Sequence, residues 1–327
     1  MLKVGLIGCG FMGSMHANCY NNIEGVTVTA VADLRRDKAE ELAKLSGAEI
    51  YETGKELIAK ADVDVIDICL PTYLHTKHAL LAMDKVKYVF VEKPVSLTLD
   101  QGKALLAKAE ASGAQVQVGQ VIRFWDEYVE LAKIIKSGKL GKVVNANFRR
   151  LSPLPTWGWE NWLFDMNKSG GAGQDLHVHD IDYILSLFGE PAKFFSAKST
   201  LGRENDYVAT LMQYDDFVVS VEGTWALPGT YPFTATFRVV FEKGVVENQG
   251  GKFLCYTDEG VEEIKIEKVQ LAGGAYKGGN VSDLGGYYNE LVYFCDKAAK
   301  GEKIEQATLS DAVASLDFLL RELSFKG

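Results

Sequence analysis

The chain has 327 residues, of which 47% are hydrophobic and 24% are charged, a composition typical of a globular protein long enough for two domains. Its formal net charge is −9 and it contains no long run of basic residues, which argues against nucleic acid as a partner. No apolar run approaches the length of a membrane span, and the first predicted strand begins too early to leave room for a signal peptide. The five cysteines are scattered and include no C-x-x-C, so we expect a cytoplasmic protein with reduced thiols.

Short apolar runs alternate with amphipathic stretches through the first 120 residues. Continuous apolar strands separated by helices are typical of a parallel sheet that is covered on both faces, so this part predicts a doubly wound nucleotide-binding fold. Strands are predicted at 3–7, 26–32, 63–70, 88–92 and 115–118, with a weaker one near 49–51, and helices at 37–45, 74–83 and 99–112.

A glycine-rich segment, Gly8-Cys9-Gly10-Phe11-Met12-Gly13, connects the first strand to a helical pattern. In this context the spacing is typical of a dinucleotide-binding loop, whose glycines allow the tight turn, the approach of phosphate and close helix–strand packing. Asp33 ends the next strand, where a carboxylate accepts hydrogen bonds from both ribose hydroxyls and repels a 2′-phosphate. The pattern therefore predicts NAD; Arg35 and Arg36 would receive the phosphate of NADP if Asp33 turned aside.

The pattern of the sequence changes from about residue 124. Several later strands alternate apolar and polar residues, as expected for a half-exposed antiparallel sheet in an α+β domain. Helices are predicted at 127–136, 174–188, 287–300 and 309–323, and strands at 143–149, 208–214, 217–225, 234–241, 245–249 and 253–257.

Lys93 follows the predicted strand 88–92 and precedes Pro94. Ligands bind outside the carboxyl ends of strands in open α/β sheets, which predicts Lys93 at the mouth of the binding crevice. An ammonium group there can polarise a carbonyl or lower the pKa of a substrate hydroxyl. The alternative is an ordinary cation at a strand end.

Two of the five histidines, His177 and His179, follow the turn Gly170-Gly171-Ala172-Gly173 in a predicted helix. On a regular helix Asp175, His179 and Asp182 share one face. A carboxylate one turn from an imidazole can fix its tautomer and raise its basicity, which is how a general base is tuned. Asp175 could instead stabilise the helix N-terminus. A metal site is disfavoured because His177 and His179 project to opposite sides of a helix.

Three of the five tryptophans lie in the segment Trp157-Gly158-Trp159-Glu160-Asn161-Trp162. Aromatic faces flanked by polar side chains suit a sugar or polyol ring, which has apolar CH faces and polar edges. Packing of a long loop onto a sheet is equally compatible with this pattern.

The glycine segment, Asp33, Pro71-Thr72 with His75, Glu92-Lys93-Pro94 and Asp175-x-x-x-His179 together resemble the glucose–fructose oxidoreductase / inositol dehydrogenase / MocA (Gfo/Idh/MocA) family of NAD(P)-dependent oxidoreductases. The motifs occur in the family's order over nearly the whole chain. The resemblance implies an N-terminal Rossmann domain at 1–121 and a C-terminal α/β domain at 122–327, whose mostly antiparallel open sheet forms a homodimer or homotetramer contact. It also suggests a cis peptide bond before Pro94.

The resemblance implies Lys93, Asp175 and His179 as a catalytic trio. The chain departs from the pattern at His177, where many members have glycine; we interpret His177 as a polar surface or loop contact. The implied cofactor contacts are Gly8, Gly10, Phe11, Met12, Gly13, Asp33, Arg35, Leu70, Pro71, Thr72, His75, Glu92 and Lys93. The implied substrate contacts are Lys93, Arg123, Trp162, Asp175, His179 and Tyr287.

These features predict an NAD-dependent dehydrogenase, with NADP as a possible cofactor and no metal. It would act on a secondary alcohol of a sugar, inositol or related polyhydroxylated compound. A non-catalytic dinucleotide-binding sensor is one alternative, disfavoured because a sensor has no need of Lys93, Asp175 and His179 together. A glycosidase that uses NAD without net redox change is another, and the sequence leaves it open.

Overall fold

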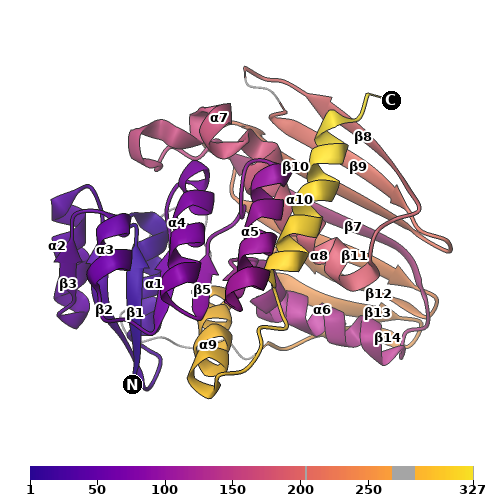
Figure 1. The fold of residues 1–327 in the computed structure, drawn as a ribbon. Helices are drawn as coiled ribbons and strands as arrows, with labels where there is room; N and C mark the ends of the chain where they lie inside the picture. The colour runs from indigo at the N-terminus through magenta and orange to yellow at the C-terminus, as the bar shows by residue number, and fades with distance from the viewer. Residues whose placement is uncertain (203–204, 267–283, 327) are drawn as a thin grey trace. The chain divides into compact units, whose positions relative to one another are not determined.

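The computed structural model describes residues 1–202, 205–266 and 284–326 (Figure 1). These residues form two compact units, each built from segments that are distant in the sequence. The described part of unit 1 comprises residues 1–121, 157–169 and 284–316, and that of unit 2 comprises 122–156, 170–202, 205–266 and 317–326. The units are defined by packing; the division into continuous domains 1–121 and 122–327 stays a prediction.

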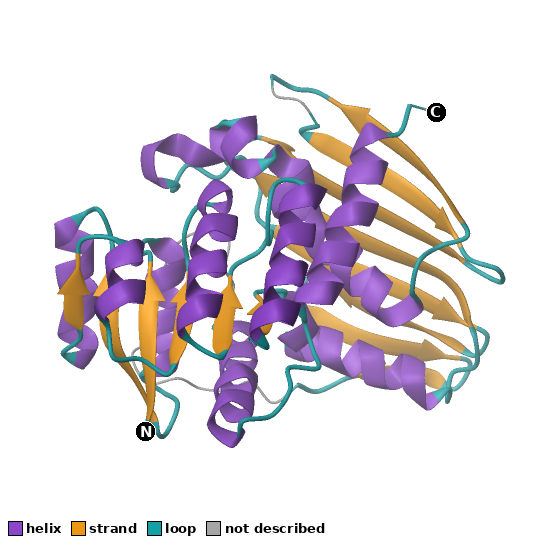
Figure 2. Cartoon of the chain, in the orientation of Figure 1, coloured by secondary structure: helices purple, strands orange, loops and turns teal. Residues whose placement is uncertain are grey.

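Unit 1 contains a six-stranded parallel sheet in the order β3-β2-β1-β4-β5-β6 (Figure 2). The order reverses direction between β1 and β4, which creates the crevice where such sheets bind ligands. All four residues of β4 and of β5 are buried, which explains why the strands appear in the sequence as unbroken apolar runs. The strands are β1 (Leu2–Ile7), β2 (Val26–Ala32), β3 (Glu49–Tyr51), β4 (Val65–Ile68), β5 (Tyr88–Val91) and β6 (Gln115–Val118).

Helices flank this parallel sheet, with α1 packed on α9 and α4 packed on α5. Helix α5 shows how local sequence sets helix ends: Thr98 and Gln101 form a reciprocal capping box at its start, and Gly113 ends it at φ 72°. The helical segments are α1 (Phe11–Tyr20), α2 (Arg36–Ser46), α3 (Gly54–Lys60), α4 (Thr72–Lys85), α5 (Leu99–Ser112), η2 (Trp159–Phe164), α7 (Met166–Ser169) and α9 (Gly285–Lys300).

Unit 2 contains an eight-stranded sheet in the order β14-β13-β12-β11-β7-β10-β9-β8. Only the pair β7–β10 is parallel, so the predicted mostly antiparallel sheet is confirmed. The two outermost strands, β8 and β14, were not predicted. The strands are β7 (Val143–Pro153), β8 (Lys193–Ser199), β9 (Tyr207–Gln213), β10 (Val218–Leu227), β11 (Thr234–Phe241), β12 (Gly244–Gln249), β13 (Lys252–Thr257) and β14 (Gly260–Glu263).

The predicted helix 174–188 is not regular in the structure: it begins with a π-helical turn, η3 (Gly173–His177), and continues as α8 (Val178–Phe188). A side chain at position 173 would crowd Leu323, because its Cβ would lie 2.8 Å from that side chain. The remaining helices are η1 (Val121–Phe124), α6 (Asp126–Ser137) and α10 (Leu309–Ser324), whose last residues belong to unit 2.

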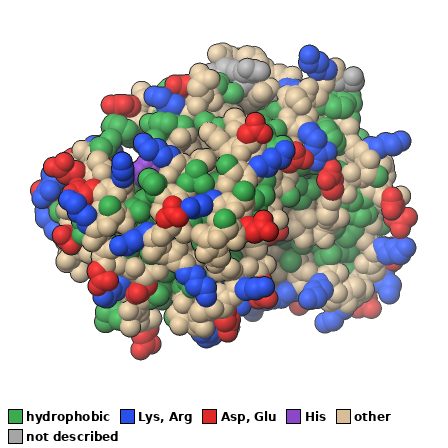
Figure 3. All heavy atoms as spheres, viewed as in Figure 1, with side chains coloured by type: hydrophobic (Ala, Val, Ile, Leu, Met, Phe, Trp, Pro, Cys, Tyr) green, Lys and Arg blue, Asp and Glu red, His purple; other side chains and the backbone are tan. Residues whose placement is uncertain are grey.

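Positive and negative side chains are interspersed on the face shown in Figure 3. Among the described residues, no helix combines the length and apolar character that a membrane crossing requires.

Candidate active site

The glycine segment forms the connection from β1 to α1. Gly8 has φ 97°, and a Cβ there would lie 2.5 Å from the carbonyl oxygen of Cys69; a Cβ at Gly13 would lie 1.8 Å from the carbonyl oxygen of Gly8. A Cβ at Gly10 would meet nothing closer than Nη2 of Arg35, at 3.4 Å. No side chain caps α1 at Gly10. The first and third glycines therefore allow close packing, and the second leaves room at a helix N-terminus, which fits a diphosphate.

Asp33 is held beside this loop at the end of β2. Its Oδ2 accepts a hydrogen bond from the Cys9 main-chain N–H at 2.8 Å. The Arg35 guanidinium donates from Nε to Oδ1 and from Nη2 to Oδ2, both at 3.1 Å. Asp33 is thus oriented toward the loop, and the guanidinium that could receive a 2′-phosphate is paired with a carboxylate. Both features are consistent with the predicted preference for NAD.

His75 connects the loops that follow β4 and β5. It is 1% exposed; its Nε2 lies 2.6 Å from the carbonyl oxygen of Leu70 and its Nδ1 lies 2.8 Å from that of Pro94. Burial lowers the pKa of His75, and the two carbonyl contacts act against this effect. Whether His75 also contacts the cofactor stays a prediction. Its contacts show that it connects the loop that precedes Thr72 with the loop that bears Lys93.

Lys93 lies one residue beyond Glu92 at the carboxyl end of β5, as predicted, and its side chain is half-buried. The peptide bond between Lys93 and Pro94 is cis, as the resemblance suggested. The Lys93 main-chain N–H donates to Oε2 of Glu92 at 3.1 Å.

In unit 2, Asp175 and His179 stand out by exposure. Every residue from 169 to 184 is buried except these two. Asp175 lies in η3 and His179 lies in the first turn of α8. The two predicted catalytic residues are therefore the partly accessible residues of this segment. Their catalytic roles stay a prediction.

Asp182 of α8 and Arg123 form a mostly buried ion pair in unit 2. The predicted face shared by Asp175, His179 and Asp182 does not include Asp182 as an accessible group, because Asp182 is fully buried. Arg123 donates to it from Nε at 2.6 Å and from Nη2 at 2.8 Å. Arg123 therefore anchors α8, and its predicted contact with substrate stays a prediction.

A second buried ion pair anchors the same helix and was missed in the sequence. Arg150 of β7 donates from Nε to Asp180 at 2.6 Å and from Nη2 at 3.1 Å, and it also contacts the Tyr128 hydroxyl at 3.3 Å. The one available signal was an arginine in phase with the apolar Ala146 and Phe148 of β7, in a chain whose later helix carries two aspartates.

The interpretation of His177 as a surface or loop contact is wrong. His177 is fully buried, and its Nε2 lies 3.0 Å from Oε1 of Glu322 on α10. Gly223 of β10 makes room for the ring, because a Cβ there would lie 2.7 Å from the His177 Nδ1. Although burial acts to lower it, the Glu322 carboxylate raises the pKa of His177 above its ordinary value. His177 thus pairs with a carboxylate of its own unit.

The tryptophan segment belongs to unit 1. The Trp157 ring lies 4.7 Å from the ring of Phe11 in the glycine segment, and the Arg35 guanidinium lies 5.5 Å from the ring of Trp159. Trp157 therefore contacts the glycine segment, and Trp159 contacts the arginine that pairs with Asp33. Trp162 is half-buried, and its predicted contact with substrate is untested.

Tyr287, the remaining predicted substrate contact, lies on α9 in unit 1. It is 9% exposed, and its ring lies 6.4 Å from that of His16. It is therefore mostly buried against α1, and a contact with substrate stays a prediction.

The strand order and the glycine connection define a dinucleotide-binding Rossmann protein. Residues 2–120 match the family model described as "Oxidoreductase family, NAD-binding Rossmann fold", and residues 128–247 match the "GFO/IDH/MocA C-terminal domain". The chain belongs to the Gfo/Idh/MocA family of oxidoreductases, and its cofactor is NAD.

Two curated relatives are each 28% identical to the chain. Glucose-6-phosphate 3-dehydrogenase of Bacillus subtilis matches over 214 residues, which are 64% of this chain and 59% of that protein. Myo-inositol 2-dehydrogenase of Thermotoga maritima matches over 192 residues, 58% of this chain and 55% of that protein. The chain thus spans less than two thirds of the length of these relatives. A solved structure of levoglucosan dehydrogenase with NADH and levoglucosan shares the fold, with a TM-score of 0.84 at 22% identity over 99% of this chain and 97% of that one.

Proposed function

We propose that the protein is an NAD-dependent dehydrogenase that transfers hydride between nicotinamide and a secondary alcohol or ketone of a sugar, inositol or related polyol. One observation carries the proposal: in the buried segment 169–184, only Asp175 and His179 remain accessible. A carboxylate and an imidazole left accessible together in an otherwise packed helix are suited to proton transfer.

Each residue of the trio has a defined task in this proposal. His179 removes the proton of the substrate hydroxyl, and Asp175 orients the imidazole and stabilises its charged form. Lys93 donates a hydrogen bond to the same oxygen and stabilises the negative charge that develops there. NAD, when bound, accepts the hydride; the protein supplies position, proton transfer and electrostatics.

The substrate class rests on the relatives. Those named glucose-6-phosphate 3-dehydrogenase and myo-inositol 2-dehydrogenase both act, by name, at one carbon of a polyhydroxylated ring. The proposal also includes a homodimer or homotetramer. It places the protein in the cytoplasm, a reducing compartment, because all five cysteines are free and four of them are buried.

The test is the absorbance of NADH in mixtures of protein, NAD or NADP, and a panel of inositols, aldoses and sugar acids. We expect one compound to support NADH formation, and Lys93→Ala and His179→Ala to lower kcat about 10²-fold or more. Lys85→Ala, which removes an exposed lysine at the end of α4, is the matched control and should remain active.

Full activity in Lys93→Ala would overturn the assigned roles. Cleavage of a glycosidic bond without NADH accumulation would identify the redox-neutral glycosidase instead. NADH binding without turnover of any compound would favour the sensor.

A further inference from the structure

A group of ionisable side chains that the proposed reaction does not use lies buried in unit 1. This buried cluster consists of His16 on α1, Asp67 on β4, Glu92 at the end of β5 and Glu290 on α9, and none of them is more than 4% exposed. Burying charges is costly unless they are paired, so a cluster of three acids and one imidazole calls for a physical explanation.

His16 lies between two of the acids. Its Nδ1 is 2.8 Å from Oδ2 of Asp67, and its Nε2 is 3.1 Å from Oε1 of Glu92, within ion-pairing distance although not aligned as a hydrogen bond. An imidazole that faces a carboxylate on each side is stabilised in its doubly protonated form. Burial acts to lower the pKa of His16, but Cys69 and Asp67 raise it well above its ordinary value.

Glu290 is the third acid of the buried cluster. Neither of its carboxyl oxygens has a hydrogen-bond partner among the described residues, and it offers an oxygen within 4.8 Å of the facing atoms of His16 and Glu92. Burial and the negative charge of Glu92 raise the pKa of Glu290 well above its ordinary value. The raised pKa favours the neutral form of Glu290, which spares the cluster a further buried negative charge.

Glu92 connects the buried cluster to Lys93. Its Oε1 faces His16, while its Oε2 accepts the hydrogen bond from the Lys93 main-chain N–H. Gly119 leaves the necessary space, because a Cβ there would lie 2.9 Å from Oε1 of Glu92. One carboxylate thus contacts both His16 and the main chain of Lys93.

We propose that His16, Glu92 and Glu290 are positioning residues for Lys93. His16 faces Oε1 of the Glu92 carboxylate and Glu290 lies beside it, and together they fix the orientation in which Oε2 accepts the hydrogen bond from the Lys93 main-chain N–H. This inference rests on the proposed role of Lys93. When rising pH removes the proton of His16, Glu92 faces a neutral imidazole; when it removes the proton of Glu290, Glu92 faces a second negative charge. In either case the Glu92 carboxylate is less firmly held at the Lys93 main-chain N–H. Misplacing a catalytic group by about 1 Å can cost on the order of 10²-fold in rate.

Other ionisable groups face the buried cluster. The Tyr20 hydroxyl donates to Asp67 at 2.9 Å, and the Cys69 thiol lies 3.4 Å from the same carboxylate. Burial raises the pKa of each of these two groups. The groups that face the cluster are Tyr20 and Cys19 from α1, Cys69 after β4, and Tyr287 and Cys295 from α9.

Four variants test the proposal with the substrate found by the panel. His16→Gln keeps a polar group but removes the charge, and we expect kcat to fall on the order of tenfold while NADH binding changes little. Glu290→Gln keeps the shape of the protonated acid, so it should rescue the activity that Glu290→Ala loses and should extend activity to higher pH than in the natural protein. Tyr20→Phe removes a buried hydrogen bond to Asp67 and is the matched control: it should lower stability without moving the alkaline limit of activity.

A second readout does not depend on turnover. Reductive methylation with ¹³C-formaldehyde labels the lysines for NMR, and loss of one signal in Lys93→Ala assigns Lys93. We expect the Lys93 signal to shift in His16→Gln and to stay in place in Tyr20→Phe. An unmoved Lys93 signal in folded His16→Gln would overturn this inference even if the protein is an active dehydrogenase. A shifted signal without turnover of any compound would support the inference on geometry and count against the proposed function. A stoichiometric divalent metal in the purified protein would also overturn it, because the buried cluster would then be a cation site.

Discussion

At the residue scale, His177 shows that a partner distant in the sequence can bury a side chain that the sequence alone places at the surface. It lies in the same segment as the partly accessible Asp175 and His179, yet it is buried against Glu322. The ring fits there because position 223 is glycine. A buried ion pair adds little net stability, but removing one partner leaves an uncompensated charge. His177 therefore compensates the charge of Glu322, which would otherwise be buried without a partner of opposite charge.

We expect His177→Ala to lower the free energy of unfolding by roughly 3 kcal/mol, measured by urea denaturation at pH 6. Because the pKa of His177 is raised in the folded state, the stability it contributes is fully present below about pH 6.5 and is lost as pH rises through the folded-state pKa. The loss caused by His177→Ala should therefore be smaller at pH 9 than at pH 6. An equal loss of unfolding free energy at pH 6 and pH 9 would contradict this account. So would the absence of a coupling energy between His177→Ala and Glu322→Ala in a double-mutant cycle.

At the scale of elements, the segment that contains η2 and α7 is notable because it packs in unit 1 although it follows β7 of unit 2 in the chain. Glu160 and Asn161 take left-handed conformations, with φ 49° and 53°, which non-glycine residues adopt only when their surroundings hold them. The rings of Trp157 and Trp159 supply such contacts on Phe11 and Arg35. The lysine of α7, Lys168, adds a contact with the Tyr73 ring at 5.7 Å.

We expect Trp159→Ala to weaken NADH binding about threefold, because the cation–π contact with the Arg35 guanidinium helps to hold the Asp33 carboxylate. Fluorescence titration with NADH measures the change. Trp225→Phe, which alters a buried tryptophan of unit 2, is the control for the optical signal. Unchanged affinity in Trp159→Ala would mean that the tryptophan segment stabilises the fold without supporting the cofactor site.

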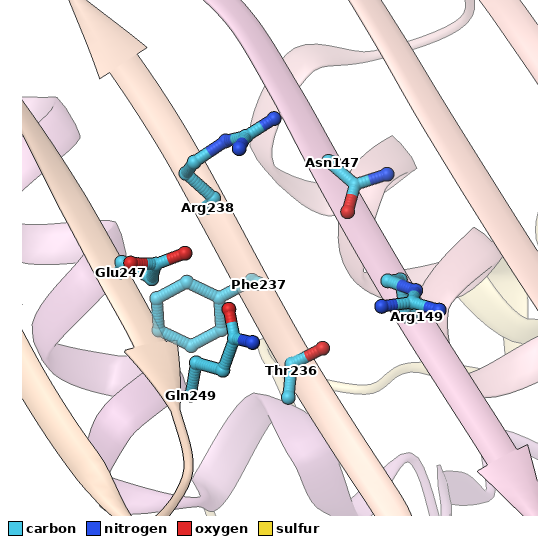
Figure 4. A pocket seen from close by; sticks show the side chains of 7 residues that line it. All are labelled: Asn147, Arg149, Thr236, Phe237, Arg238, Glu247 and Gln249. Atoms are coloured by element: carbon cyan, nitrogen blue, oxygen red, sulfur yellow. The ribbon is translucent and has the colours of Figure 1, made fainter.

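At the scale of the whole molecule, one face of the eight-stranded sheet displays apolar side chains. Phe195 and Leu211 are paired across β8 and β9 and are 56% and 50% exposed. Further along the same face a shallow pocket of about 310 Å³ lies over β7, β11 and β12 (Figure 4). It is lined by Asn147, Arg149, Thr236, Phe237, Arg238, Glu247 and Gln249. An apolar edge beside a charged centre is compatible with contact between two copies of the chain.

If this face forms the proposed homo-oligomer, Leu211→Glu should reduce the molar mass measured by light scattering after gel filtration to that of one chain. Leu45→Glu is the control, because Leu45 is 49% exposed on α2 in unit 1. A natural protein that is monomeric at micromolar concentration, or an oligomer unaffected by Leu211→Glu, would rule this interface out.

The parallel sheet, the glycine connection and the mostly antiparallel second sheet could be predicted from the sequence because they depend on local patterns. Apolar runs, period-two alternation and glycine spacing all act over a few residues. The edge strands β8 and β14 were missed for the same reason: their exposed surfaces weaken the pattern, and all four residues of β14 are exposed.

Only the tertiary structure decided which polar side chains are accessible. The pairing of Arg123 with Asp182 is a contact between residues far apart in the sequence, which no periodic pattern predicts. The same holds for His177, which lies against a glutamate 145 positions away. The π-helical turn of η3 and the packing of the tryptophan segment in unit 1 were hidden in the same way. The sequence alone therefore determined the cofactor-binding fold and its family, while the tertiary structure separated accessible groups from buried supports, because burial is a property of long-range packing.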